Sequence, residues 1–242
     1  MAERKKLYEG KAKIIFEGLK KGTYIQYFKD DATAFDGKKK GTIKNKGVLN
    51  NLITAHLMEY LASEGVRTHF LKRLNDREQL VRQVKIFPVE FVVRNIAAGS
   101  ICSRLGIEKG ISLYKDGLPL IEFYYKDDNL HDPLIGETHI LYLGLMTEYQ
   151  IGFMKKELLR VNILLTKKFT DIGIDLVDYK LEYGVADIEG ESKIVLADEI
   201  SPDTCRFWDT ETGQILDKDR FRQDMDGVED AYQEIANRLN LL

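Results

Sequence analysis

The sequence predicts an α+β fold in two lobes, an antiparallel β-rich N-terminal lobe at residues 1–86 and a larger mixed α+β lobe at residues 87–242. Short stretches of alternating apolar and polar residues dominate the first thirty positions, and this period indicates antiparallel strands. Two longer segments carry apolar residues at helical spacing. Strands and helices do not alternate strictly along the chain, as they would in a parallel α/β fold.

Composition limits the classes of function. Hydrophobic residues make up 44% of the 242 residues and charged residues 31%, as in folded globular proteins. A net charge of -3 disfavours a nucleic-acid partner and leaves room for local basic pockets that bind small phosphorylated metabolites. The N-terminus has no apolar signal segment and no stretch is long and apolar enough to span a membrane, so we expect a cytoplasmic protein. Cys102 and Cys205 lack the spacing of a zinc site or a disulfide framework and are expected to pack.

The N-terminal lobe begins with residues 6–30, which predict a meander of short strands with turns at Gly10 and Gly22. Gly10 is expected to bend the chain with a positive φ. Residues 46–63 then show helical spacing of their apolar positions, and Gly65 follows as a stop signal. This segment predicts one amphipathic helix.

Strand-like stretches follow at residues 68–74, 80–87 and 88–96. Proline cannot donate a hydrogen bond within a sheet, so Pro88 marks a place where a strand begins or bends. The boundary between the lobes is expected near this proline.

The second lobe contains a helix predicted at residues 147–170, whose apolar stripe is expected to cover the core. Residues 174–200 read as a hairpin of two strands, and residues 228–240 as a final helix. The stripe of the long helix consists of Ile151, Met154, Leu158, Val161 and Leu165.

Acidic residues interrupt the apolar pattern of the predicted hairpin. Side chains alternate between faces along a strand, so Asp178, Lys180 and Glu182 share one face. With a turn centred near Gly190, Glu182 lies opposite Asp198 on the returning strand. Two opposed carboxylates repel unless a cation compensates, and two carboxylates with polyphosphate oxygens suit Mg²⁺. A solvated, salt-bridged strand face is the alternative interpretation.

Basic residues form several candidate anion sites. Behind the Gly10 turn, Lys11 and Lys13 point to one side of a strand and suit a phosphate chain, although such lysine-rich hairpins are often simply solvated. Arg94 ends an apolar strand, and Ser100 is placed to cap a short helix, a combination that suits an anion or a plain capped helix. Arg206 is expected in a proline-containing loop after the hairpin. Residues 218–222 supply a further basic contact or a solvated turn.

Six segments in order resemble the phosphoribosylaminoimidazole-succinocarboxamide synthase (SAICAR synthetase) family over nearly the whole chain: YEGKAK, VEFVVRNIAAGS, KDDNLHDP, LVDYKLEYG, DEISPDTCRFWD and DKDRFRQD. The resemblance implies an ATP-grasp/kinase-like (SAICAR synthase-like) fold with its active site in the cleft between the lobes, and a homodimer. It implies an ATP-dependent ligase that condenses carboxyaminoimidazole ribonucleotide (CAIR) with L-aspartate to give SAICAR, ADP and phosphate in purine biosynthesis. Thr204 and Cys205 stand where the family carries smaller residues such as glycine and serine.

The resemblance also implies roles for single residues. ATP would lie on Gly10, Lys11, Ala12 and Lys13, with its adenine along the backbone of Lys85, Ile86 and Phe87 and with Mg²⁺ on Glu182 and Asp198. The ribonucleotide would contact Arg94, Ser100 and Arg206, with Asp178 and Lys180 nearby, and Lys11, Lys13, Asp178 and Lys180 would be catalytic. Candidates for binding aspartate are Asp36, Lys126, Asp203, Lys218 and Arg222.

The chemistry of amide formation suggests an order of steps. A carboxylate is a poor electrophile, so we expect ATP to phosphorylate the CAIR carboxylate before the aspartate amine attacks. No histidine is an evident general base. Two alternatives remain at this point: a kinase-like phosphotransferase, although HRD and DFG motifs are absent, and a nucleotide-binding regulatory module without turnover.

Overall fold

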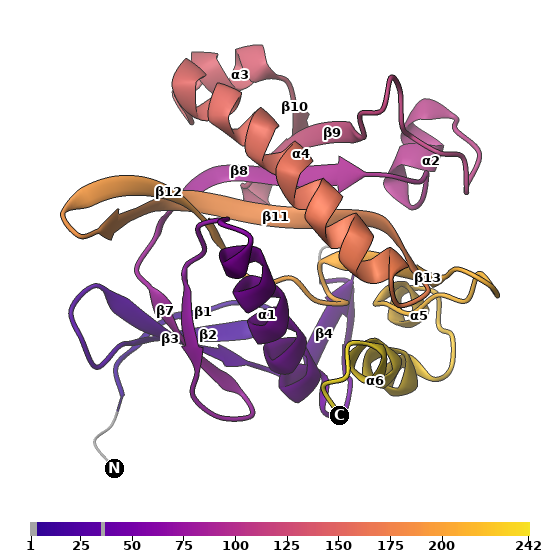
Figure 1. Ribbon diagram of the computed structural model, residues 1–242, viewed down its shortest axis with the longest axis horizontal. Coiled ribbons are helices and arrows are strands. Elements are labelled where there is room, and N and C mark those ends of the chain that lie inside the picture. Colours follow the sequence, from indigo (N-terminus) through magenta and orange to yellow (C-terminus); the bar gives the residue numbers. More distant parts are fainter. Residues whose placement is uncertain (1–3, 35–36) are drawn as a thin grey trace.

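The computed structural model describes residues 4–34 and 37–242 of the chain. Two large antiparallel sheets lie one above the other in Figure 1, with helices packed beside them, and a third sheet has two strands. The strands are β1 (Lys6–Glu9), β2 (Lys13–Glu17), β3 (Thr23–Phe28), β4 (Asp31–Ala34), β5 (Lys39–Thr42), β6 (Phe70–Arg73), β7 (Glu78–Arg82), β8 (Lys85–Arg94), β9 (Leu120–Tyr125), β10 (Leu134–Ile135), β11 (Ile174–Ile188), β12 (Glu191–Ala197) and β13 (Cys205–Asp209). The helices are α1 (Lys46–Ser63), α2 (Ser100–Leu105), the 3₁₀ turn η1 (Asp128–Leu130), α3 (Glu137–Tyr142), α4 (Glu148–Thr170), α5 (Asp219–Arg222) and α6 (Val228–Arg238).

The first sheet has the strand order β1-β2-β3-β7-β6, so the predicted N-terminal meander is confirmed. Gly22 has a φ of 77°, as a tight hairpin turn requires. The prediction for Gly10 is wrong, because its φ is not positive. Its backbone N–H instead donates to the carbonyl of Lys13 at 2.8 Å, and a Cβ at this position would lie 3.1 Å from the Tyr8 ring. The limited space beside the Tyr8 ring, and not a left-handed backbone conformation, favours glycine at this position.

Helix α1 occupies the predicted residues 46–63 and packs against β3, β6, β7 and the C-terminal helix α6. Its apolar side chains Ile53, Leu57 and Leu61 are fully buried, and Gly65 follows with a φ of 81°. Burial of this stripe stabilises the helix more than its short-range propensity does.

The second sheet has the order β10-β9-β8-β11-β12. Strand β12 pairs with the C-terminal part of the long strand β11, and β13 pairs with its N-terminal part. The strand predicted at residues 80–87 is wrong as one element, because the chain leaves the first sheet after β7 and enters the second with β8. Pro88 lies inside β8, where the pairing with β11 shifts its register between Glu182 and Gly184. A proline in a central strand is accommodated at such a bulge, which confirms the expected bend.

Helix α4 lies across the second sheet in both ribbon views. Thr147 caps it, accepting a hydrogen bond from the backbone of Gln150 while the Gln150 side chain accepts one from Thr147. The predicted apolar stripe is buried at the core, as expected. One hydrophobic cluster runs from α1 through the second sheet to α4 and α6. The division into lobes 1–86 and 87–242 stays a prediction.

The β11–β12 hairpin has a different register from the predicted one. Glu189 and Gly190 form a two-residue turn with φ values of 56° and 84°, so Ile188 faces Glu191. Glu182 therefore lies opposite Ala197, the last residue of β12. Asp198 follows the strand with a left-handed φ of 63°. The predicted facing pair of Glu182 and Asp198 is wrong by one residue.

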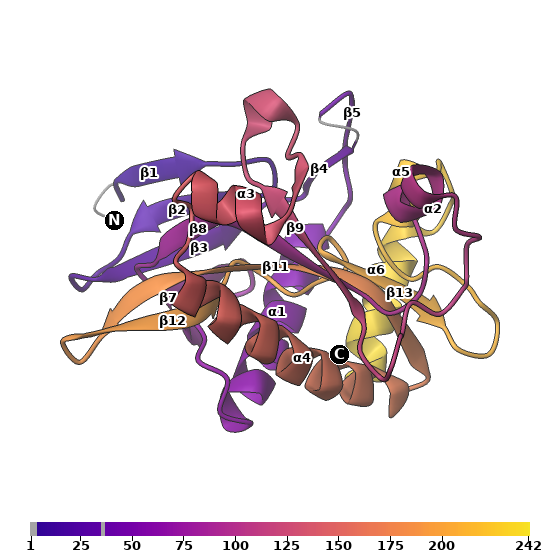
Figure 2. The same ribbon diagram turned by 90° about the horizontal axis from the view of Figure 1, so that it is seen from above.

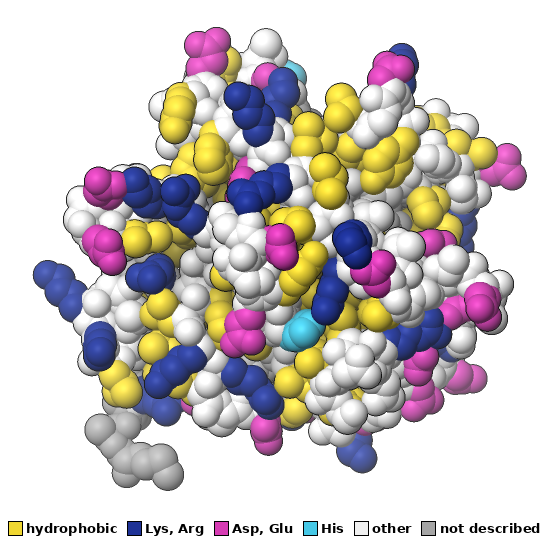
Figure 3. Space-filling model, in the orientation of Figure 1, with side chains coloured by type: hydrophobic (Ala, Val, Ile, Leu, Met, Phe, Trp, Pro, Cys, Tyr) yellow, Lys and Arg dark blue, Asp and Glu magenta, His cyan; other side chains and the backbone are white. Residues whose placement is uncertain are grey.

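The surface shown in Figure 3 mixes lysine and arginine side chains with aspartate and glutamate side chains. Among the described residues, no helix combines the length and apolar character that crossing a membrane requires.

Candidate active site

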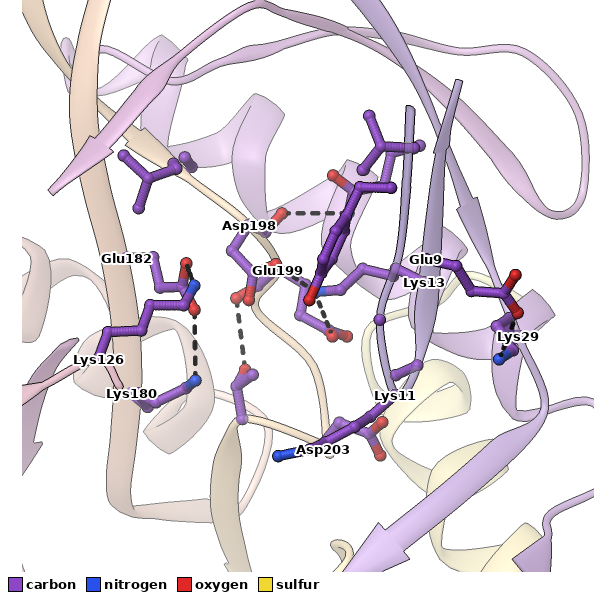
Figure 4. Close-up of a pocket in the computed structure, with 18 of the residues that line it drawn as sticks. Glu9, Lys11, Lys13, Lys29, Lys126, Lys180, Glu182, Asp198, Glu199 and Asp203 are labelled. Carbon is purple, nitrogen blue, oxygen red and sulfur yellow. Dashed lines mark hydrogen bonds and ion pairs between the residues drawn. The ribbon is translucent and has the colours of Figure 1, made fainter. Parts of the chain in front are cut away.

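A cleft of about 1670 Å³ opens between the two sheets. Its lining comes from the β1–β2 turn, the β4–β5 hairpin, the start of β8, the middle of β11 and the segment after β12. Segments far apart in the sequence thus meet around one space, and Figure 4 shows their charged side chains converging there. The predicted site residues that line it are Gly10, Lys11, Ala12, Lys13, Ile86, Phe87, Lys126, Lys180, Glu182, Asp198, Asp203 and Lys218.

The lysine turn contributes two cations to the cleft. Lys11 Nζ bonds Asp128 at 2.9 Å and is half exposed. Lys13 Nζ contacts Asp198 and lies 2.7 Å from Glu199. Burial alone lowers the pKa of Lys13, but the two carboxylates outweigh it and raise that pKa, so Lys13 stays charged. Both lysines line the same cleft, and each is paired with different acidic residues.

Glu182 and Asp198 are each neutralised by lysines in this structure. Glu182 accepts hydrogen bonds from Lys126 at 2.5 Å and from Lys180 at 3.4 Å. Burial raises the pKa of Asp198, but Lys13 and Lys180 lower it to about 2, so this carboxylate is ionised at neutral pH. The expectation that these two acids repel without a metal is therefore wrong, because lysines from β2, β11 and the segment after β9 supply the compensating charge.

Magnesium remains compatible with this donor set. Among residues 4–34 and 37–242, no three His, Cys, Asp or Glu side chains group as a metal site. Mg²⁺, however, binds through one or two carboxylates and takes its other ligands from phosphates and water. Glu182 and Asp198 are two oxygen donors that line one cleft together with Lys11 and Lys13. The residues fit Mg²⁺ bound to a polyphosphate.

A second group of charges, the arginine cluster (Arg94, Asp178, Arg206 and Asp219), lies further along β11 and outside the cleft lining. Arg94 Nη1 and Arg206 Nη1 both donate to Asp178, at 2.7 and 2.8 Å. Arg206 Nε donates to Asp219 at 2.7 Å. Arg94 is almost fully buried, and its Nε also bonds Glu122 at 2.6 Å. The carboxylates thus hold both guanidinium groups in fixed orientations.

Arg206 belongs to strand β13 and faces Asp178 on β11, which corrects its predicted place in a loop. Asp178 alternates with Lys180 and Glu182 on one face of β11, so the arginine cluster continues the row of cleft residues. The sheet pairing therefore places the predicted anion site beside the predicted metal site.

Ser100 is not the cap of α2, contrary to the prediction, because Gly99 occupies the N-cap position. A Cβ on Gly99 would lie 2.5 Å from Arg206 Nη2, and its φ of 64° also favours glycine. This glycine lets the arginine approach the backbone before α2. Ser100 Oγ instead accepts a long 3.5 Å hydrogen bond from Arg104.

Three predicted residues lie elsewhere. Lys85 is exposed at the start of β8 and does not line the cleft. Arg222 bonds Asp219 at the edge of the arginine cluster. Asp36 lies outside the described residues.

The structure also adds residues that the sequence interpretation missed. Lys180 bonds Glu90 at 2.5 Å, and Glu90 interrupts the apolar residues on the half-buried face of β8, between Pro88 and Val92, as Asp198 interrupts the apolar pattern of its own segment. The same alternation rule would have found Glu90. Lys46 is almost completely buried against Asp203, but as the first residue of a helix it carried no such signal.

The chain matches the family model described as SAICAR synthetase over residues 6–239. The synthase from Rhizorhabdus wittichii is 54% identical over 242 residues, covering 100% of this chain and 93% of the relative. The synthase from Gluconacetobacter diazotrophicus is 56% identical over 243 residues, covering 100% and 94%. Both relatives are named phosphoribosylaminoimidazole-succinocarboxamide synthase.

Solved structures show the same likeness. A phosphoribosylaminoimidazole-succinocarboxamide synthase from Ehrlichia chaffeensis matches with a TM-score of 0.94 and 47% identity, covering 98% of this chain and 99% of the other. A SAICAR synthetase in complex with ADP matches with a TM-score of 0.90 and 44% identity, covering 98% and 97%. The two-lobed α+β fold expected from the sequence is confirmed.

Proposed function

This chain belongs to the SAICAR synthetase family, and on that premise we propose that its cleft uses ATP to condense CAIR with L-aspartate, forming SAICAR, ADP and phosphate. The full-length similarity to synthases supports this activity, and the ADP complex of a relative supports a nucleotide substrate. The observation that carries the proposal is the convergence of the lysine turn and of two ionisable carboxylates on one cleft.

ATP is proposed to lie along the lysine turn. The backbone of Gly10 and Ala12 and the ammonium groups of Lys11 and Lys13 surround the phosphates, which need several donors and cations. The adenine lies against the backbone where β8 begins, at Lys85, Ile86 and Phe87. Bound phosphate oxygens then replace part of the carboxylate contacts that Lys11 and Lys13 make in this structure.

Glu182 and Asp198 are proposed to hold Mg²⁺. When bound, the ion neutralises charge on the phosphates as the terminal phosphoryl group is transferred. Lys126 and Lys180, which now compensate Glu182, are then free to contact substrate groups.

CAIR is proposed to place its phosphate against the arginine cluster. Asp178 and Asp219 bind Nη1 and Nε of Arg206, while its Nη2 makes no hydrogen bond within the described part of the chain. A guanidinium oriented by carboxylates and retaining a free N–H is suited to phosphate oxygens. Arg94 donates to the same Asp178, Ser100 directly follows Gly99 in the chain, and Lys180, two residues after Asp178 on β11, lines the cleft.

The reaction is proposed to pass through an acyl phosphate. The CAIR carboxylate attacks the terminal phosphorus of ATP, and ADP leaves. The aspartate amine then attacks the activated carbon, and phosphate leaves with the electron pair of the C–O bond. Lys11, Lys13 and Lys180 orient the anionic groups and stabilise their charge, which accounts for most of the rate gain in such transfers. Candidates for holding aspartate are Asp36, Lys126, Asp203, Lys218 and Arg222.

Three broader features complete the proposal: lobes at residues 1–86 and 87–242, a homodimer, and a place in the cytoplasm. Omitting ATP, Mg²⁺, CAIR or aspartate in turn from an assay of product formation tests the function. Each omission is expected to abolish the product. ADP release with CAIR that does not depend on aspartate and yields no amide would instead favour a kinase-like phosphotransferase, and the absence of any turnover would favour a regulatory module.

A further inference from the structure

Lys218 lines the cleft in an unusual environment. Its side chain is 13% exposed, and its Nζ lies 3.8 Å from Asp203 Oδ2, too far for a hydrogen bond. Asp203 instead accepts hydrogen bonds from Lys46 Nζ, at 2.7 Å on the same Oδ2, and from the Tyr232 hydroxyl, at 2.6 Å on Oδ1. Among the described residues, the Lys218 ammonium therefore has no hydrogen-bond acceptor.

The other lysines of the cleft differ from Lys218. Lys11, Lys13, Lys126 and Lys180 each contact a carboxylate at hydrogen-bond distance. Lys29 does the same, and Lys40, which has no such partner in the described chain, is exposed to water. Within the described part of the chain, only Lys218 among the cleft lysines combines burial, an opening on the cleft and no acceptor.

Cations and acids from several elements face Lys218. Lys46 at the start of α1 and Arg222 in α5 contribute positive charge, and Asp203 and Glu199 in the segment between β12 and β13 contribute negative charge. Burial is the largest influence on the pKa of Lys218 and lowers it, and Arg222 and Lys46 lower it further against the opposing effect of Asp203. A desolvated lysine beside other cations gives up its proton more readily than a solvated one.

Four other groups that line the cleft are poorer proton acceptors. Lys13 and Lys180 hold their protons more tightly than free lysine, since nearby carboxylates outweigh burial and raise both pKa values. The pKa of Asp198 is lowered to about 2, and burial lowers that of His69 to about 4. Acceptors with such low pKa values take up protons weakly near neutral pH.

The aspartate amine must lose a proton before it can attack, because an ammonium group has no free electron pair. We propose that Lys218 is the general base that accepts this proton. The inference rests on the proposed amide-forming reaction and adds a residue for its second step. Asp203 does not take the proton itself but, with Lys46 and Tyr232, fixes the surroundings of Lys218.

The step balances as follows. The neutral Lys218 amine takes one proton from the substrate ammonium and becomes charged. The freed nitrogen electron pair forms the C–N bond at the acyl carbon, and the C–O bond to phosphate breaks with its electrons on the phosphate oxygen. The second proton of the former ammonium group goes to the departing phosphate, and the third remains on the amide.

Two substitutions separate a base from a carboxylate anchor. Lys218→Met removes the amine, and Lys218→Arg keeps a positive charge that cannot act as a base. Lys21→Met, at an exposed turn, is the matched control. We expect kcat to fall about 10²- to 10⁴-fold in both Lys218 variants, with little change in the KM for aspartate. The rise of wild-type kcat with pH, as Lys218 loses its proton, should disappear in Lys218→Met.

The outcomes distinguish the inference from the proposed function. A wild-type protein that makes no amide product refutes the proposed function. If the wild type is active, then either a wild-type kcat in Lys218→Met, or a higher aspartate KM that Lys218→Arg restores, overturns the role as base. Calorimetric ADP binding equal to that of Lys21→Met shows that a slow variant still has a folded nucleotide site.

Discussion

Alanine at position 99 is predicted to displace the Arg206 guanidinium and weaken binding of the ribonucleotide phosphate. Gly99 has φ and ψ angles of 64° and -138°, a region that is essentially restricted to glycine. A Cβ there would lie 2.5 Å from Arg206 Nη2 and 2.8 Å from its Cζ. Backbone strain and a clash with a side chain held by Asp178 and Asp219 therefore act together.

The two effects have separate magnitudes. A non-glycine residue in such a backbone region costs about 1–3 kcal/mol of folding free energy. Loss of a charge-assisted hydrogen bond to phosphate costs about 1.5–3 kcal/mol of binding free energy. The second effect corresponds to roughly a tenfold to hundredfold increase in the KM for CAIR. The KM values for ATP and aspartate should change little, since the predicted contacts of these substrates lie elsewhere.

Gly106→Ala is the matched control. Gly106 ends the same helix α2 with a similar φ of 64°, but a Cβ there meets no atom within 4 Å. Steady-state kinetics and thermal unfolding of both variants would separate strain from the clash. An equal KM for CAIR in the two variants would refute the proposed contact between Arg206 and the substrate phosphate.

Three further predictions concern the metal site, a thiol and a buried acid. Glu182→Gln should lower kcat by on the order of tenfold or more and raise the Mg²⁺ concentration needed for activity, measured by magnesium titration; unchanged product formation would exclude Glu182 as a ligand. Cys205 is buried, and burial raises its pKa, so a thiol reagent should modify only Cys102 in the native protein and both cysteines after unfolding. Mass spectrometry counts the modified cysteines, and rapid modification of native Cys205 would contradict this burial. Burial, with Asp219 nearby, raises the pKa of Asp217 from 3.8 to about 7, so this acid binds its proton more tightly when folded. Its contribution to stability is present below pH 4 and is lost as pH rises toward 7. Asp217→Asn should therefore flatten the dependence of unfolding free energy on pH over this window, measured by urea denaturation, and an unchanged slope would argue against the raised pKa.

Much of the local structure could be predicted because its signal is short in sequence. The helices at residues 46–63 and 147–170 follow from apolar spacing and end signals that lie within the segments themselves. The capping pair of Thr147 and Gln150 is separated by three positions. In contrast, the register of the β11–β12 hairpin depends on the conformation of two turn residues. The predicted register was wrong by one position, and Asp198 follows the strand instead of lying within it.

The candidate site was predicted in its residue types more fully than in its contacts. The lysine turn and the acids Glu182 and Asp198 do line one cleft. Their partners were not predictable, because Glu182 contacts Lys126, 56 positions away, and Asp198 contacts Lys13, 185 positions away. Charge compensation by such distant lysines replaced the expected repulsion.

The sequence by itself determined the family and the α+β class. It also determined which segments carry charged residues at positions where the strand pattern predicts apolar ones. Tertiary structure alone decided that Arg206 lies on a strand facing Asp178 and that Gly99 makes room for it. It also decided that Lys218 lies beyond hydrogen-bond distance of Asp203, which accepts from Lys46 and Tyr232. The physical reason is one of range. Periodicity and capping act between neighbours in the chain, whereas the electrostatic environment of an ionisable group depends on every charge and every buried surface that folding brings around it.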